Sequence, residues 1–438
     1  MSDIDPLNPT AQQPIIRVSG LRVEFETDDG VVAGVKDVSF EIAPGETLCV
    51  VGESGSGKSV TSLSILRLIE FGGGRIGAGA LEFARESGDV IDLASASGDV
   101  MQSIRGNAIG MIFQAPMTSL NPVFTIERQL TDGRRRHRGL AGEDARKRAL
   151  ELLREVRIPE PERRLSQYPH ELSGGMRQRI VIAMAMACRP RLLIADEPTT
   201  ALDVTIQAEI LGLIDRLKRE NGMAVLFITH DMAVVAQMAD RVVVMYRGDV
   251  VEEGPVGRIF DAPREPYTRA LLAAVPRLGE MQGTSGPEPM RILGDAPPAP
   301  AAPRSEPSTK GGPLLDVRHL TTRFPVKGGL LRRTIAEVHA VEDVSFSLAR
   351  GETLSLVGES GCGKSTCGRT ILRLIEANSG EIQLDGWNVR SLGRLDLQRA
   401  RRDMQMVFQD PFASLNPYRR LADQVAEPLI NFGLASGS

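Results

Sequence analysis

Thr47-Leu-Cys-Val-Val-Gly-Glu-Ser-Gly-Ser-Gly-Lys-Ser59 joins a short apolar run to a glycine-rich loop. The apolar part, residues 47–51, predicts a buried strand. The loop that follows fits the pattern G-x-x-x-x-G-K-[ST], in which backbone amides and a helix N-terminus bind phosphate groups. Lys58 adds a positive charge, and the Ser59 hydroxyl is a ligand for Mg²⁺. This stretch therefore predicts an α/β protein that binds a nucleotide.

A second loop of the same pattern, Gly358 to Ser365, lies within a longer internal repeat. Residues 35–60 align without gaps to residues 341–366, and 18 of the 26 positions are identical. Two phosphate loops at matching places in a repeat indicate a duplicated nucleotide-binding domain. The counterparts of the later motifs of the first copy would fall beyond Ser438, so we expect an incomplete second copy.

Hydrophobic patterns predict the rest of the first copy. Residues 16–26 alternate between apolar and polar side chains, as in a half-buried strand, and residues 192–195 and 224–229 are buried-strand candidates. Residues 58–69 and 205–220 have helical patterns. Strands that alternate with helices predict a mainly parallel core.

Several polar residues follow these predicted strands. Asp196 is suited to contact Mg²⁺, and Glu197 to orient and deprotonate an attacking water. We expect the Gln114 side chain to reach the metal and the attacking water, and the His230 side chain to contact the terminal phosphate. Leu172 begins a Leu-Ser-Gly-Gly sequence, a polar turn before a predicted helix.

The order of these motifs resembles the nucleotide-binding domain of ABC transporters, a P-loop NTPase fold. The resemblance implies a parallel β core, an antiparallel β subdomain and a helical signature subdomain, tandemly repeated. In that family two domains enclose two ATP molecules head to tail, so the Ser-Gly-Gly signature would act in trans. Asp203 would lie in the loop that connects the two sites. Phe25 and Phe324 match the aromatic that stacks on adenine, although a core phenylalanine is nearly as good an interpretation.

These arguments predict a complete set of site residues. The predicted catalytic residues are Glu197, His230 and Gln114. The predicted Mg²⁺ ligands are Ser59, Gln114, Asp196, Ser365 and Gln409. The residues predicted to bind ATP are Phe25, Gly52, Ser54, Gly55, Gly57, Lys58, Ser59, Val60, Ser173, Gly174, Gly175, Asp203, Phe324, Gly358, Ser360, Gly361, Gly363, Lys364, Ser365, Thr366 and Gln409.

Residues 113–122 and 264–272 are similar to segments of the dipeptide/oligopeptide importer subfamily of ABC transporters. One departure is Ala115, where that subfamily has an acidic residue. The resemblance implies an ATPase that powers import of glutathione or a short peptide through two permease subunits, with a periplasmic binding protein as an indirect partner. It also implies a peripheral protein on the cytoplasmic face of the inner membrane. Without a second signature, hydrolysis would require self-association of first domains between chains.

The resemblance and the composition together predict four segments: an N-terminal tail at residues 1–14, a first nucleotide-binding domain with a C-terminal extension at 15–280, a Pro/Ala-rich linker at 281–313, and an incomplete second domain at 314–438. The linker composition predicts an extended, semi-rigid segment.

Composition restricts the alternatives. The net charge of −4 gives no general case for nucleic-acid binding, and we interpret the basic run Arg134 to Arg138 as a solvated surface loop. No apolar stretch is long enough for a membrane helix, so we expect no direct membrane insertion.

A soluble tandem ATPase that acts on ribosomes remains an alternative, as does a nucleotide-binding product with little hydrolysis. The four cysteines form no CxxC pair, which argues against a zinc-containing DNA-repair ATPase.

Overall fold

The computed structural model describes residues 13–28, 30–114, 119–139, 142–200, 202–275, 279, 312–328, 333–409 and 414–435. The chain divides into two compact units, residues 1–301 and 302–438. The predicted N-terminal tail and linker lie almost entirely outside the described residues, as do Ala115 and Ala201. Within the described part, no helix is long and apolar enough to span a membrane.

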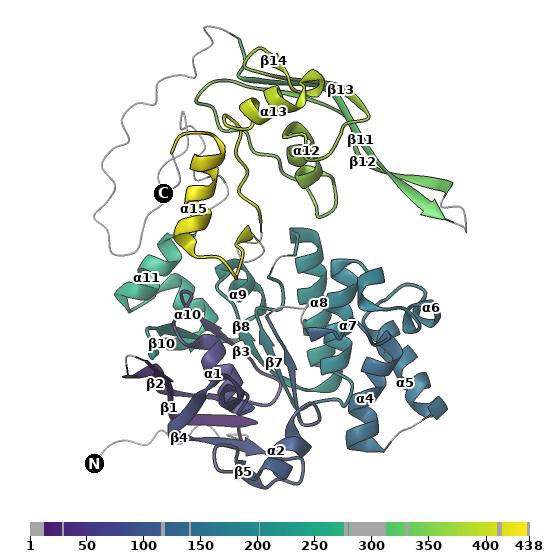
Figure 1. Cartoon of the computed structure of the whole chain (residues 1–438). Coiled ribbons are helices and arrows are strands. Elements are labelled where there is room, and N and C mark those ends of the chain that lie inside the picture. The colour runs from purple at the N-terminus through teal and green to yellow at the C-terminus, as the bar shows by residue number, and fades with distance from the viewer. Residues whose placement is uncertain are drawn as a thin grey trace. The chain divides into compact units, whose positions relative to one another are not determined.

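The described residues of the first unit contain one large sheet with the strand order β5-β4-β1-β2-β10-β9-β3-β8-β7-β6. Most of these strands are labelled in Figure 1. Its antiparallel part consists of β5 (Val90–Asp92), β4 (Gly74–Ala84), β1 (Ile16–Thr27) and β2 (Gly30–Ile42). Its parallel part consists of β9 (Arg241–Tyr246), β3 (Thr47–Val51), β8 (Ala224–Ile228), β7 (Leu192–Asp196) and β6 (Ile109–Ile112). Between these parts, β10 (Asp249–Pro255) pairs antiparallel with β9. The predicted parallel core and antiparallel subdomain are confirmed.

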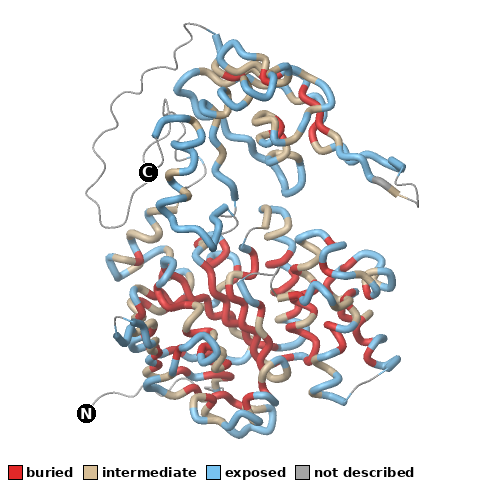
Figure 2. Tube along the Cα trace, viewed as in Figure 1, coloured by how far each residue is buried: buried red, intermediate tan, exposed pale blue. Residues whose placement is uncertain are grey.

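The parallel strands are buried on both faces, which explains their continuous apolar sequences. Along β3, Leu48 and Val50 belong to one hydrophobic cluster, whereas Cys49 and Val51 belong to the other. Strands β7 and β8 divide their side chains between the same two clusters. Figure 2 shows the buried residues of this unit concentrated along the sheet. The ends of these strands therefore have fixed positions, and the loops that follow them share this support.

The helices of the first unit fall into two groups along the chain. Between β6 and β7 lie α4 (Ile126–Arg138), α5 (Gly142–Glu155), α6 (Pro161–Leu165), η2 (Pro169–Glu171) and α7 (Gly174–Ala185), which form the helical subdomain. The remaining helices are α1 (Lys58–Ile65), η1 (Ile69–Gly72), α2 (Gly98–Ile104), α8 (Val204–Asn221), α9 (Met232–Met238), α10 (Val256–Asp261) and α11 (Pro266–Ala273). Helix α1 is shorter than predicted, because the chain turns at Arg67 with a positive φ before η1 begins.

The interpretation of the basic run as a loop was wrong. Residues 134–138 form the last turns of α4, which Thr125 caps at its N-terminus and Gly139 ends with a left-handed conformation. Cations near the C-terminus of a helix interact favourably with its dipole, so the same charges that suggested a solvated loop stabilise a helix end.

The second unit forms a smaller antiparallel sheet, with the strand order β12-β11-β13-β14 in its described residues. Its elements are β11 (Leu315–Gly328), β12 (Arg333–Leu348), β13 (Ser379–Leu384), β14 (Trp387–Asn388), η3 (Val389–Ser391), α12 (Lys364–Ile371), α13 (Arg394–Ala400) and α15 (Leu421–Asn431). The counterpart of β3, residues 353–357, is not a strand, and Val357 is 92% exposed. In the first unit β3 is held between β8 and β9, whereas no strand pairs with residues 353–357 among the described residues of the second unit.

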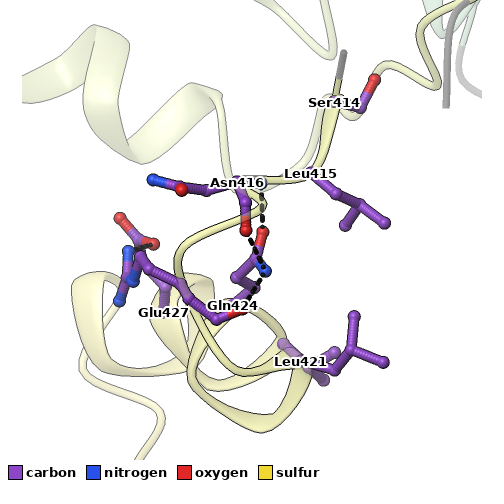
Figure 3. Close-up of a pocket in the computed structure, with 8 residues that line it drawn as sticks. Ser414, Leu415, Asn416, Leu421, Gln424 and Glu427 are labelled. Carbon is purple, nitrogen blue, oxygen red and sulfur yellow. Dashed lines mark hydrogen bonds and ion pairs between the residues drawn. The ribbon is translucent and has the colours of Figure 1, made fainter. Parts of the chain in front are cut away.

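A local hydrogen-bond pattern is nevertheless repeated in both units. The Gln424 side chain accepts from the Asn416 amide at 2.7 Å and donates to the Asn416 carbonyl at 3.1 Å, and both residues line a cavity (Figure 3). In the first unit Gln129 makes the same two bonds to Asn121, at 2.9 and 3.0 Å. Local sequence therefore fixes this turn in both units.

Candidate functional site

Four adjacent parallel strands deliver the predicted site residues to one edge of the first unit's sheet. Strand β3 leads into the phosphate loop, β8 ends two residues before His230, β7 ends at Asp196, and β6 ends two residues before Gln114. Ligands of open α/β sheets bind beyond the carboxyl ends of the strands. The sequence alone could not give this strand order, which brings four separate motifs together.

The phosphate loop closes around the Lys58 side chain. The Lys58 ammonium donates to the carbonyls of Gly52 and Glu53, at 2.8 and 2.7 Å, and the residue is only 6% exposed. Gly57 has φ 97°, and a Cβ there would lie 2.7 Å from the Gly34 carbonyl oxygen, so only glycine fits. Burial lowers the pKa of the Lys58 ammonium, although nearby carboxylates oppose this. The loop presents a positive charge in a fixed, glycine-dependent turn.

Asp196 lies beside the first turn of α1. Ser59 Oγ donates to Asp196 Oδ1 at 3.1 Å, and Ser62 Oγ donates to Asp196 Oδ2 at 3.5 Å. Burial raises the pKa of this carboxyl, and the Glu197 charge acts in the same direction. A buried carboxylate next to a serine hydroxyl is an oxygen-ligand set that suits Mg²⁺. The described residues contain no group of three or more His, Cys, Asp or Glu side chains that could hold a metal, so a metal here would use hydroxyl and amide oxygens as well.

Glu197 is the centre of a hydrogen-bond network. Its carboxylate accepts from Gln114 Nε2 at 3.0 Å and from Thr200 Oγ1 at 2.9 Å, and its Oε1 lies 2.9 Å from His230 Nδ1. Burial raises the pKa of this carboxyl, but the hydrogen bonds from His230, Thr200 and Gln114 outweigh it and the pKa is lowered overall. Glu197 is therefore an ionised acceptor at neutral pH.

The Glu197 backbone is held in an unusual conformation. Its φ is 47°, in the left-handed region, and its amide donates to the carbonyl of Ile228, the last residue of β8. A non-glycine residue in this region requires support from its surroundings. This turn directs the side chain to both Gln114 and His230, which come from the neighbouring strands.

Sequence reasoning missed three contacts around the site. Thr200 bonds Glu197 and Ser62 bonds Asp196, as described above, and Tyr267 reaches the phosphate loop. The Tyr267 hydroxyl accepts from the Glu53 amide at 3.1 Å, and its ring lies 4.3 Å from that of Tyr246, centroid to centroid. Tyr267 belongs to α11, more than 200 positions away in sequence, so only the fold reveals this contact.

We predict that Tyr267→Ala weakens ATP binding by roughly three- to tenfold, because the loop amide of Glu53 loses its acceptor and the ring its contact with Tyr246. Tyr267→Phe should recover the ring contact alone and give an intermediate value. Equilibrium titration with ATP measures both variants. Unchanged affinity in Tyr267→Ala would show that the loop holds its shape without α11.

The signature residues lie apart from this network. Ser173 caps α7 and accepts from the Met176 amide, while Gly174 and Gly175 form the first turn of that helix. Asp203 caps α8 and accepts from the Ile206 amide at 2.9 Å. Among the described residues, no hydrogen bond or ion pair joins these four to Lys58 or Glu197. Within the described part of the first unit, these four residues are therefore not connected to the predicted ATP site by polar contacts.

The two predicted aromatic residues differ in their surroundings. Phe25 on β1 packs against the hydrophobic cluster that contains Leu48 and Val50, and its ring lies over the backbones of Gly34 and Gly74. Phe324 on β11 is 39% exposed. The remaining predicted residues of the first loop, Gly52, Ser54, Gly55 and Val60, occupy the turn and the start of α1.

The second phosphate loop has the same local form but a different setting. Lys364 donates to the carbonyls of Gly358 and Glu359, both at 2.6 Å, and Gly363 has φ 98°. Ser360 and Gly361 lie in the turn, and Ser365 and Thr366 begin α12. In the part of this unit that the structure describes, neither Ser365 nor Gln409 has a carboxylate partner equivalent to Asp196 or Glu197.

Comparison with family models agrees with this geometry. A model described as "ABC transporter" matches residues 35–200 and 341–431, and one described as "Oligopeptide/dipeptide transporter, C-terminal region" matches residues 251–299. The chain therefore belongs to the ABC transporter family, as an ATP-binding protein of the oligopeptide/dipeptide importer type. It is an ATPase that binds ATP and works with membrane permease subunits.

The chain is similar to the glutathione import ATP-binding protein GsiA of Escherichia coli (strain K12), with 53% identity over 425 residues that cover 97% of this chain and 68% of that protein. The proteins of the same name from Escherichia coli O157:H7 and Shigella flexneri match to the same extent. Among solved structures, the ADP- and phosphate-bound dimer of the ATP-binding cassette MJ0796 is 30% identical, with a TM-score of 0.49, and covers 55% of this chain and 98% of that one.

Proposed function

We propose that this chain powers the import of glutathione or a short peptide, by Mg²⁺-dependent ATP hydrolysis at the site of the first unit. The observation that carries the proposal is the network of Gln114, Glu197 and His230 beside Lys58 and Asp196. The close similarity to glutathione import ATP-binding proteins supports the substrate class.

Binding of ATP would begin at the phosphate loop. Lys58 and the loop amides would hold the phosphates, with the helix N-terminus of α1 directed at them. Ser59, Asp196 and the side-chain oxygen of Gln114 would hold Mg²⁺, which supplies charge neutralisation between the phosphates when bound. The raised pKa of Asp196 supports this role, because a nearby cation would relieve the cost of burying the carboxylate.

Hydrolysis would depend on Glu197. Its carboxylate accepts a proton from water, whose oxygen forms the new bond to the γ-phosphorus as the bond to the β–γ bridging oxygen breaks and ADP leaves. His230 holds Glu197 through Nδ1, and its side chain is 64% exposed, which leaves Nε2 accessible to a γ-phosphate. Gln114 fixes the other carboxylate oxygen.

The partners follow from this assignment. Two permease subunits would receive the mechanical work, and a periplasmic binding protein would deliver the substrate to them. The chain would act as a peripheral protein on the cytoplasmic face of the inner membrane. Because Ser173, Gly174, Gly175 and Asp203 lie apart from Lys58, they would complete a site on a second domain, for which pairing of two first domains is one source.

The test is transport in proteoliposomes that hold the permease subunits, with this chain and ATP inside and the binding protein outside. We predict ATP-dependent uptake of labelled glutathione that requires the chain and fails without Mg²⁺. No stimulation of uptake by the chain would contradict the importer function. Uptake of dipeptides with no uptake of glutathione would contradict only the glutathione assignment.

A further inference from the structure

The end of α4 borders a cavity of about 630 Å³. Four arginines line it: Arg134 and Arg138 from α4, and Arg189 and Arg191 from the segment between α7 and β7. Among the described residues of the lining, Glu86 is the one acidic side chain. We call this the arginine cavity. In the sequence only the basic run Arg134 to Arg138 is apparent, because the fold brings Arg189 and Arg191 to it.

The arginine cavity is separate from the nucleotide site. Pro44, Arg191 and Gly222 line it, and they precede β3, β7 and β8 respectively. The phosphate loop, Glu197 and His230 follow the carboxyl ends of those same strands. The cavity thus lies at the opposite edge of the sheet, and ATP binding does not account for its charges.

The four guanidinium groups of the arginine cavity form no ion pair within the part of the chain that the structure describes; none of them has a carboxylate of that part within ion-pair distance. Arg148, in the neighbouring helix α5, instead pairs with both Glu151 and Glu155. Burial lowers the pKa of the Arg134 guanidinium, and the charges of nearby arginines act in the same direction. Like charges at close range are unfavourable unless an anion joins them.

Hydrogen bonds to backbone carbonyls account for the positions of only some of the four arginines. Arg134 and Arg138 donate to the carbonyls of Ala187 and Cys188, just beyond α7, and Arg191 donates to a carbonyl at the end of β4. Each guanidinium has five N–H donors, so these bonds orient the groups and leave most donors unused. The exposed Arg189 side chain makes no hydrogen bond in the described part of the chain. Binding to backbone carbonyls therefore does not explain why an arginine stands at this position.

We propose that the arginine cavity binds a multiply charged phosphate compound. Guanidinium groups match phosphate oxygens with two parallel hydrogen bonds, and several of them together favour an anion with more than one negative charge. The cavity volume accommodates a group of pyrophosphate size. A soluble phosphate compound and the headgroup of an anionic lipid share this chemistry.

Inorganic pyrophosphate is the probe, and calorimetric titration of the full chain counts its binding sites. The cavity variant is Arg138→Glu with Arg189→Glu. The control is Arg135→Glu with Arg136→Glu, which makes the same change of charge on exposed residues of α4 outside the cavity lining. Both variants keep the two phosphate loops, so pyrophosphate binding at those loops is common to both.

The control should bind pyrophosphate like the unmodified chain, whereas the cavity variant should lose one class of site, by roughly tenfold or more in affinity. Added KCl should weaken the same site, because salt screens the interaction. Retained ATP binding verifies the fold, and Arg138→Gln with Arg189→Gln repeats the test with a smaller change of charge. Equal pyrophosphate binding by the cavity variant and the control would overturn the proposal.

A second measurement distinguishes the two sources of phosphate. Vesicles of equal parts phosphatidylglycerol and phosphatidylcholine are sedimented with each variant. If the cavity variant alone fails to sediment, the ligand is a lipid headgroup. If both variants sediment equally while pyrophosphate binding still differs, the ligand is a soluble phosphate compound.

Discussion

Glu197→Gln is expected to reduce the rate of ATP hydrolysis by about 10²–10⁴-fold and to leave ATP binding intact. The carboxylate accepts hydrogen bonds from Gln114, Thr200 and His230, and its pKa is lowered, so it is poised to take a proton from water. An amide of the same shape cannot accept that proton. Phosphate release and equilibrium ATP binding, measured on the same preparation, separate the two effects.

Glu143→Gln is the matched control for this variant. Glu143 lies exposed in the first turn of α5, far along the chain from any predicted site residue, and no ion pair or hydrogen bond of its side chain occurs among the described residues. The Glu143→Gln variant should hydrolyse ATP at the rate of the unmodified chain. If Glu197→Gln retained that rate as well, another group would have to serve as the base.

The elements near the site could be predicted from sequence where local pattern and burial agree. Strand β3 has the predicted bounds, and β1, β7, β8 and α8 lie within one residue of theirs. Each has a continuous or periodic apolar pattern because it is buried on a fixed face. The phosphate loop was equally predictable, since its glycines have to adopt positive φ values at Gly52, Gly55 and Gly57.

Long-range contacts were not predictable, for a physical reason. Tyr267 meets Glu53, and Arg189 joins Arg134, only because the sheet order places distant segments together. Residues 353–357 repeat the apolar character of β3 but do not form a strand in this structure. A strand requires partners as well as its own propensity. Sequence pattern describes what a segment is able to form, and tertiary context decides whether it does so.

The two phosphate loops differ in the structure that supports them, and this difference should affect how strongly each binds ATP. Both loops close around a lysine in the same way, but the first follows β3, whose residues are all buried, whereas the second follows an exposed, irregular segment. The first lysine also has Asp196 and Glu197 nearby, which couple it to the hydrolytic network. A loop that is held in its binding shape before the ligand arrives loses less entropy on binding.

Lys58→Ala is therefore expected to weaken ATP binding by roughly 10–100-fold, because one charged hydrogen-bond donor to phosphate is lost, whereas Lys364→Ala should change it by less than about threefold. Lys147→Ala, an exposed position of α5 without a described partner, is the control for loss of a positive charge. Titration with radiolabelled ATP and Mg²⁺ measures affinity and stoichiometry for all three. Equal effects of Lys58→Ala and Lys364→Ala would mean that loop geometry alone, without the supporting sheet, sets the affinity for ATP.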